Sequence, residues 1–186
     1  MNLPEHIKKM AKLSNELEDE FFKAFKREEL PKGHLLFEQG KICKHIFYIE
    51  KGFARVYYHS NSGKEITAWF SADNSFVTAI DSFYYHKPTR DYCELIEDSV
   101  VYSIKISDLE DMLEKGNGAR LAFYLLYEIT GKIVEFIVSI KFQTAEERYN
   151  ALMQDYPSVF QRASLGNIAS YLGITQETLS RIRAVK

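Results

Sequence analysis

The sequence predicts an α+β protein: a small antiparallel β-barrel or jelly roll, then a long dimerisation helix, then a small all-α unit. Three observations support this prediction. Between about residues 33 and 104, short β-branched and aromatic runs alternate with turn residues at spacings of roughly 8 to 12. After residue 107 the apolar spacing becomes helical. Residues 164–183 then show the pattern of two short helices joined by a tight turn.

The first helix is expected over residues 14–29, with Ser14 as its N-cap and an apolar residue every four positions behind it. Pro31 and Gly33 should end it. The strand segments that follow lie at residues 34–40, 45–52, 53–59, 65–70 and 94–104. Between two of them, the Asn-Ser-Gly sequence at residues 61–63 predicts a hairpin turn.

A long helix is expected from Ser107, its N-cap, to about residue 141. Its apolar residues follow the 3,4 spacing of a heptad repeat. The seam is formed by Ala119, Ala122, Leu126, Ile129, Ile133, Phe136 and Ile140. This pattern favours a homodimer in which the seam meets a second copy. The alternative is a core helix packed on the barrel, because further apolar residues widen the face.

The C-terminal unit begins with a helix over residues 144–156, where Thr144 and Glu147 form a capping box and Pro157 ends the helix. In the helix–turn–helix that follows, Gly173 supplies the positive φ of the turn and Thr175 caps the second helix. The outer face of that second helix is polar. Its DNA-contacting candidates are Gln176, Glu177, Thr178, Ser180, Arg181 and Arg183.

These side chains can form hydrogen bonds with base edges in the major groove. Arg181 can donate two hydrogen bonds to guanine, Glu177 can accept from cytosine, and Gln176 can address adenine. The alternative is that Glu177 and Arg181, four residues apart, form an ion pair on a solvated helix. Both interpretations can be correct if the ion pair breaks when the helix binds DNA.

The charge balance bears on this interpretation. The chain has 186 residues, 46% of them hydrophobic, with 24 basic and 26 acidic side chains, for a net charge of −2. This composition excludes a disordered chain and a protein that coats nucleic acid by bulk charge. Residues 162–186, however, hold four basic side chains against one acidic. Binding should therefore depend on two aligned recognition helices.

Metal sites and catalysis are not expected. Cys43 and Cys93 lie fifty residues apart without a metal-ligand spacing, so both are expected to be buried thiols. No HxH pair, GxSxG or phosphate loop is present, which argues against a small β-barrel enzyme. The N-terminal segment has no apolar signal region, and residues 121–140 hold three charges. A soluble, cytoplasmic protein is expected.

Two segments resemble the opening of a cyclic-nucleotide-binding barrel: residues 33–40 (GHLLFEQG) and 46–57 (IFYIEKGFARVY). Followed by a long helix and by residues 177–181 (ETLSR), they make the chain similar to the Crp/Fnr transcription regulators over nearly its whole length. The resemblance implies a cytoplasmic homodimer that binds palindromic double-stranded DNA, with RNA polymerase as a further partner. It also implies that an effector in the barrel reorients the recognition helices.

The effector pocket departs from that family's pattern. Residues 78–81 (TAID) stand where the family has its ribose-binding Gly-Glu-Leu-Gly segment, so the carboxylate is replaced by Ala79. Asp91 follows Arg90, where a hydroxyl is expected beside the cyclic phosphate. Two like charges 4 Å apart repel by about 4 kcal/mol at a dielectric constant of 20. Cyclic AMP and cyclic GMP are therefore not expected to bind, and no cofactor is expected.

Another small effector is one possibility for the pocket, and aromatic side chains filling the vacated space are the other. The pocket candidates are Phe76, Ala79, Phe83, Arg90 and Asp91. The expected units are a sensor barrel with its N-terminal helix (1–107), the dimerisation helix (108–143) and the DNA-binding unit (144–186). The chain stops five residues after Arg181, so the family's β-hairpin wing is expected to be absent. The rival function is a sensing or dimerisation module without DNA binding.

Overall fold

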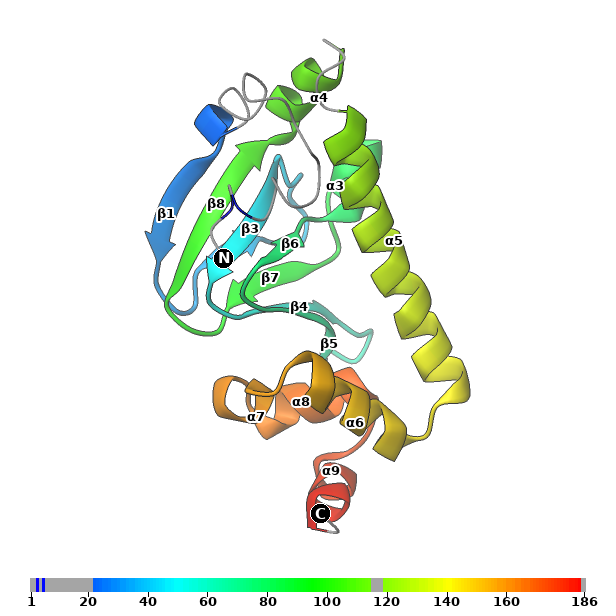
Figure 1. Cartoon of the computed structure of the whole chain (residues 1–186). Helices are drawn as coiled ribbons and strands as arrows, with labels where there is room; N and C mark the ends of the chain where they lie inside the picture. Colours follow the sequence, from blue (N-terminus) through cyan, green and yellow to red (C-terminus); the bar gives the residue numbers. More distant parts are fainter. Residues whose placement is uncertain (1–2, 4, 6–21, 115–118, 185–186) are drawn as a thin grey trace.

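The computed structural model describes residues 3, 5, 22–114 and 119–184. Within these ranges the chain forms two four-stranded antiparallel sheets, followed by helices (Figure 1). The first sheet has the order β1-β8-β3-β6 and the second β2-β7-β4-β5. The strands are β1 (Lys26–Leu30), β2 (Leu35–Phe37), β3 (His45–Lys51), β4 (Ala54–His59), β5 (Glu65–Ser71), β6 (Ser75–Val77), β7 (Tyr92–Leu95) and β8 (Ser99–Lys105). The helices are α3 (Ile80–Tyr85), α4 (Ile106–Glu114), α5 (Ala119–Phe142), α6 (Ala145–Asp155), α7 (Val159–Arg162), α8 (Leu165–Leu172) and α9 (Gln176–Ala184).

Strand β3 is buried on both faces, and this explains its continuous apolar run. Side chains alternate between the two faces of a strand. Phe47 and Ile49 point between the sheets, where the barrel core lies. Ile46 and Tyr48 point to the opposite face, where α4 covers the first sheet. The expected jelly roll is confirmed.

The hairpin between β4 and β5 is confirmed at the expected residues. The Gly63 N–H donates to the Ser60 carbonyl at 2.8 Å, and the Ser60 N–H donates to the Lys64 carbonyl at 2.8 Å. Gly63 has φ of +79°, a conformation that favours glycine. The turn brings β5 back beside β4, and this strand pair receives the C-terminal helices.

The expectation of a helix over residues 14–29 is wrong in its last part. Residues 22–24 are helical, but β1 pairs with β8 over its full length. Alternate residues share one face of a strand, so Lys26 reaches Glu28 at 2.8 Å and Arg27 reaches Glu29 at 3.2 Å. The hydrogen bonds offered by the edge of β8 outweigh the local helix preference. Residues 14–21 lie outside the described residues.

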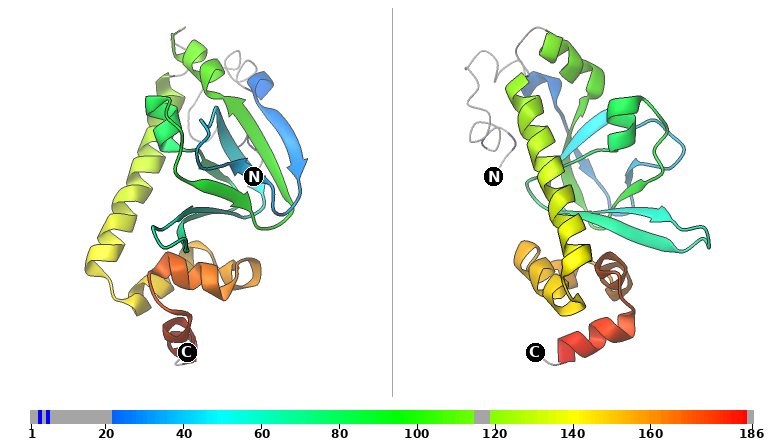
Figure 2. Two further views of the ribbon diagram at one scale, coloured as in Figure 1. Left: turned by 180° about the vertical axis from the view of Figure 1, so that it is seen from behind. Right: turned by 90° about the vertical axis from the view of Figure 1, so that its right-hand side faces the viewer.

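The single helix expected from Ser107 to about residue 141 is two helices, α4 and α5. α4 starts at Ile106, so Ser107 lies inside its first turn and is not its N-cap. The start is fixed by the Ile106 N–H, which donates to the Lys44 carbonyl at 2.9 Å. Leu109 and Met112 of α4 pack on the first sheet, at one end of the barrel. α5 then runs down the side of the barrel (Figures 1 and 2).

The C-terminal helices share a core with the barrel. Phe53 and Phe70, from the barrel, lie in one buried cluster with residues of α6, α7, α8 and α9. The Phe53 and Phe70 rings stack at 5.3 Å, and Tyr171 of α8 approaches Phe70 at 5.2 Å. The Tyr156 hydroxyl donates to the Phe70 carbonyl at 3.0 Å. The helices are therefore docked on β4 and β5, as both views in Figure 2 show.

Candidate nucleic-acid interface

Helix α8 has a defined start and a defined end. At its start, the Ser164 hydroxyl accepts from the Asn167 N–H at 3.1 Å. At its end, Gly173 adopts a left-handed φ of +67°. The Gly173 N–H donates to the Ser170 carbonyl, and the Ile174 N–H donates to the Ala169 carbonyl. This pair of bonds is a Schellman motif, which turns the chain sharply out of the helix. The expected turn at Gly173 is confirmed.

Helix α9 is anchored on one side and open on the other. The Thr175 hydroxyl accepts from the Thr178 N–H at 3.2 Å, which confirms Thr175 as the N-cap. Leu179 is fully buried against α8. The opposite face carries Glu177, Ser180 and Arg181, which are exposed, and Gln176 and Arg183 are exposed at its sides. Thr178 is half-buried.

The arginines of α9 have neighbours that limit their orientation. A guanidinium N–H of Arg181 donates to the Thr178 hydroxyl at 3.3 Å. The Arg183 guanidinium lies over the Phe160 ring of α7, 4.5 Å from its centroid. Arg181 thus points along the open face, while Arg183 lies toward α7. Of the two, Arg181 is the one placed to reach a base edge.

Gln176 lies against α8 because Gly166 leaves room for it. A Cβ on Gly166 would meet the Gln176 amide nitrogen at 3.1 Å, a tight contact. The absence of a side chain at Gly166 lets the first residue of α9 approach the first turn of α8. This contact fixes the starting point of the open face.

Of the four pocket candidates whose side chains the structure describes, only Arg90 and Asp91 lie together. Ala79 is buried in the core between the sheets, whereas the Phe76 ring packs at a tilt against Tyr48, with centroids 4.9 Å apart, on the outer side of the first sheet. Arg90 is 81% exposed and faces Asp91 at 3.9 Å. Burial raises the pKa of Asp91, and Arg90 partly opposes that shift. The side chain of Phe83 lies outside the described residues.

The space between the sheets is filled by apolar side chains. Phe37, Phe47 and Leu95 lie in the same cluster as Ala79. Cys43 and Cys93 belong to that cluster as free, buried thiols, which confirms the expectation for both. An open groove of about 230 Å³ is lined by residues 35–38 and 41–45, and none of the four described pocket candidates lines it.

Helix α5 exposes an apolar face along its length. Phe123 is 72% exposed and Ile137 is 50% exposed. Among the described side chains of α5, the exposed large apolar residues are Phe123, Leu126, Tyr127, Ile133, Val134, Ile137, Val138, Ile140 and Phe142. A contiguous apolar surface of this kind marks an interaction site.

The seam residues expected on α5 divide between two sides of the helix. Leu126, Ile133 and Ile140 are exposed, while Ile129 and Phe136 are half-buried. The Phe136 ring lies 6.0 Å from Trp69 of β5 and 6.1 Å from Tyr171 of α8. The open face is therefore centred about one residue further along, near Phe123 and Ile137, a rotation of about 100°.

Three arginines that the sequence patterns did not single out hold the C-terminal unit in place. Arg55 of β4 is 6% exposed, and it donates to Asn167 of α8 at 2.7 Å. Arg148 of α6 and Arg162 of α7 bond to α8 and to the barrel, respectively. In the sequence, only Arg55 hinted at this role, because it places a charge between the aromatic residues Phe53 and Tyr57 in an alternating strand pattern.

The described residues contain neither a membrane-spanning helix nor a cluster of metal ligands. No helix among them is long and apolar enough to cross a membrane. No group of three or more His, Cys, Asp or Glu side chains within those ranges is placed to hold a metal ion.

Comparisons with known proteins agree with this architecture. Residues 27–116 match the model of the cyclic nucleotide-binding domain family. The fumarate and nitrate reduction regulatory protein of Salmonella typhimurium is 26% identical over 173 residues, covering 84% of this chain and 67% of the relative. The same regulator from Escherichia coli K12 matches equally well.

Solved structures share the fold at lower identity. The c-di-GMP responsive global regulator CLP of Xanthomonas campestris has a TM-score of 0.70 at 12% identity, covering 91% of this chain and 89% of that one. FixK2 from Bradyrhizobium japonicum has a TM-score of 0.70 at 19% identity, covering 86% and 83%. The chain therefore contains a match to the cyclic nucleotide-binding domain and is similar to the Crp/Fnr transcription regulators over most of its length.

Proposed function

We propose that this protein is a transcription regulator of the Crp/Fnr type, a homodimer that binds a palindromic double-stranded DNA site, with one α9 helix in the major groove of each half-site. The observation that carries the proposal is the division of α9 into a buried side and an open polar side. Leu179 anchors the helix to α8, and Glu177, Ser180 and Arg181 lie exposed on the other side. This division is what a recognition helix needs, since its base-reading side chains must be free of the domain core.

The open side offers both kinds of hydrogen-bonding group. Arg181 supplies donors for guanine, and Glu177 supplies an acceptor for the cytosine amine. Ser180, beside them, can contact a base or a phosphate. Because the chain carries a net charge of −2, sequence-independent attraction to phosphates is weak. Affinity should therefore depend strongly on the base sequence and on both subunits binding together.

The dimer is proposed to form through the open apolar face of α5. The helix has 24 residues, so it spans about 36 Å at 1.5 Å per residue. Phe123 and Ile137 stand near the middle of the face, and covering such side chains stabilises by about 25 cal/mol per Å² of apolar surface. A second copy of α5 offers a surface of the same length and character.

The barrel is proposed not to bind cyclic AMP or cyclic GMP. Ala79 leaves no carboxylate for the ribose, and it lies within a packed apolar core. Arg90 is turned toward Asp91 and solvent. Because Asp91 is acidic, a cyclic phosphate beside Arg90 would meet a carboxylate rather than a hydroxyl donor.

The remaining assignments follow from the proposed DNA binding. As a regulator acting on promoters, the dimer is proposed to work in the cytoplasm and to contact RNA polymerase. We divide the chain into a sensor barrel (1–107), a dimerisation helix region (108–143) in which α5 forms the interface, and a DNA-binding unit (144–186).

Selection of duplexes from a randomised DNA pool tests the proposal. The purified chain should enrich a motif with two inverted half-sites separated by about one helical turn, as a two-fold dimer requires. Enrichment of a single half-site would overturn the dimeric arrangement. A pool that stays random after repeated rounds would overturn specific DNA binding.

A further inference from the structure

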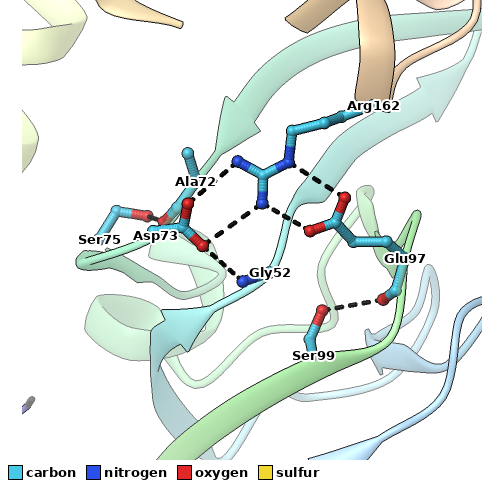
Figure 3. A network of polar contacts seen from close by, with 7 residues as sticks. All are labelled: Gly52, Ala72, Asp73, Ser75, Glu97, Ser99 and Arg162. Carbon is cyan, nitrogen blue, oxygen red and sulfur yellow. Dashed lines mark hydrogen bonds and ion pairs between the residues drawn. The ribbon is translucent and has the colours of Figure 1, made fainter. Parts of the chain in front are cut away.

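Arg162, the last residue of α7, bonds to two carboxylates of the barrel (Figure 3). Its Nε and Nη2 groups donate to Glu97 at 3.0 and 2.6 Å. Its Nη1 and Nη2 groups donate to Asp73 at 3.1 and 3.3 Å. Each carboxylate is therefore held by two N–H groups, the strongest geometry that arginine offers. The guanidinium also lies over the Phe53 ring, 4.6 Å from its centroid.

On the barrel side, further hydrogen bonds hold the loops that carry the two carboxylates. Asp73 lies between β5 and β6, and its Oδ1 also accepts from the Gly52 N–H at 2.6 Å. Gly52 has φ of +135°, and a Cβ there would lie 2.1 Å from the Ser99 hydroxyl, so the position requires glycine. Ser99 in turn donates to the Glu97 carbonyl at 2.9 Å. The Asp73 carboxylate is thus held by Gly52 as well as by Arg162, and the backbone of Glu97 is held by Ser99.

Two further bonds hold α8 on the same side of the barrel. The Asn167 side chain accepts from the Arg55 guanidinium at 2.7 Å. The Ser170 hydroxyl accepts from the Thr67 N–H at 2.9 Å. Asn167 and Ser170 are three residues apart, so they share one face of α8. With Arg162 just before α8, the helix is held at several points along its length.

The docked face and the DNA-reading face lie on opposite sides of the helix–turn–helix. Helix α8 lies between β5 and α9, and α9 projects away from the barrel (Figures 1 and 2). The docking contacts therefore leave the exposed side of α9 free. On the barrel side, Trp69 of β5 contacts Phe136 of α5 at 6.0 Å. A chain of contacts thus runs from the dimerisation helix through the barrel to α8 and α9.

From these contacts we infer that Arg162 is a positioning residue for DNA recognition. The inference rests on the proposed DNA binding. Held by Asp73 and Glu97, Arg162 fixes α8, and with it α9, relative to α5. In a dimer joined through α5, the two α9 helices are then presented at the spacing of the palindrome before DNA arrives. The ordering cost of binding is lower for such a preorganised pair.

This role predicts a difference between a palindrome and a single half-site. One half-site engages one α9 helix, so its affinity does not depend on the spacing between two. Arg162→Ala should lower affinity for the selected palindrome by about tenfold, which is about 1.4 kcal/mol, and leave half-site affinity within about twofold. Arg27→Ala is the matched control, because Arg27 pairs with Glu29 and Glu50 on the far sheet. It should change neither affinity.

A substitution that keeps the charge tests whether the paired hydrogen bonds themselves are responsible. Arg162→Lys keeps the positive charge between Asp73 and Glu97 but loses the paired N–H groups, so with Lys in place of Arg the palindrome affinity should lie between those of Arg162→Ala and wild type. Asn167→Ala removes the hydrogen bond between Arg55 and α8 without changing the number of charges. It provides a second variant should Arg162→Ala fail to fold, and it should lower the same palindrome-to-half-site ratio.

A measurement without DNA separates this inference from the proposed function. Hydrogen exchange of the Thr67 amide reports docking, because that N–H is bonded to Ser170 of α8. Exchange should rise in Arg162→Ala and should not rise in Arg27→Ala. Unchanged exchange, or an unchanged palindrome-to-half-site ratio, would overturn the positioning role. Wild-type protein that binds no DNA while Arg162→Ala raises exchange would overturn the DNA-binding proposal and leave the docking contact established.

Discussion

Arg148 of α6 closes the end of α8 by donating two hydrogen bonds to the Leu172 carbonyl oxygen, at 3.1 and 3.0 Å. A third N–H of the same guanidinium donates to the Gln143 carbonyl at 2.7 Å, just after α5 ends. The last carbonyls of a helix have no partner within the helix. One side chain therefore satisfies the ends of two helices and joins the dimerisation helix to the helix–turn–helix.

Replacing Arg148 by alanine should destabilise the C-terminal unit. The Leu172 and Gln143 carbonyls would lose their partners, and an unsatisfied, partly buried acceptor costs about 1–3 kcal/mol. Urea denaturation of Arg148→Ala should show a loss of that size. The surface variant Arg27→Ala should lose less than about 1 kcal/mol. Equal stability of Arg148→Ala and wild type would show that water replaces the arginine without cost.

The capping box of α6 should make stability depend on pH in the acid range. Hydrogen bonds from the Thr144 N–H and hydroxyl hold the pKa of Glu147 below its usual value of 4.5. The folded state therefore favours the ionised carboxylate. Its contribution is fully present above pH 4.5 and is lost as pH falls through the lower, folded-state pKa. Denaturation curves between pH 6 and pH 3 would show the loss.

Glu147→Gln is the matched variant for this effect. Glutamine also serves at this position of a capping box but does not titrate. The variant should fold, and its stability should fall less steeply than that of wild type below pH 4.5. A slope identical to wild type would assign the acid sensitivity to other carboxylates.

Ile137→Glu should break the dimer and leave the fold intact. Ile137 is half exposed on the open face of α5, so a charge there costs little in one subunit. In the proposed dimer the same charge would be buried against a partner helix, which is strongly unfavourable. Analytical ultracentrifugation should show a monomer. Emission from Trp69, the single tryptophan, should keep its wild-type maximum because the barrel is unchanged.

Glu146→Lys provides a comparison, since Glu146 is exposed near the start of α6 and away from that face. This variant should remain dimeric. A dimer that persists in Ile137→Glu would place the interface elsewhere on the molecule.

Cyclic nucleotides should not stabilise the protein against heat. A ligand at 100 times its dissociation constant stabilises by about 2.7 kcal/mol, which is easily detected as a shift in Tm. With cyclic AMP or cyclic GMP at 1 mM we expect no shift beyond that given by AMP. A specific shift with either cyclic nucleotide would show that Arg90 turns into the barrel and that Ala79 does not prevent binding.

Local signals explain which parts of this molecule could be predicted. The turn at Gly173 and the caps at Thr144 and Thr175 involve residues close in sequence, and all three appear as expected. The strand at residues 26–30 was missed because its partner β8 lies some seventy residues further along the chain. Strand pairing with a partner so distant in sequence produces no alternation of apolar and polar residues in a charged segment such as this one.

The same reasoning applies to the candidate site. The exposed residues of α9 follow from one helical pattern, and the structure bears out their exposure at Glu177 and Arg181. The contact between Arg162 and Asp73 joins residues 89 positions apart, and a single arginine in a helical segment gives no sign of its partner. Likewise, the inward turn of Phe136 depends on Trp69 and Tyr171, which come from two other elements.

The most direct test of DNA recognition is a fluorescence anisotropy titration of the selected palindrome with wild-type protein and Arg181→Ala. Wild type should bind the palindrome at least about a hundredfold more tightly than a duplex of the same composition in shuffled order. Arg181→Ala should lose about 1–3 kcal/mol on the palindrome and little on the shuffled duplex, because it removes a base contact from each half-site. Equal affinity of both proteins for both duplexes would contradict sequence-specific binding through α9.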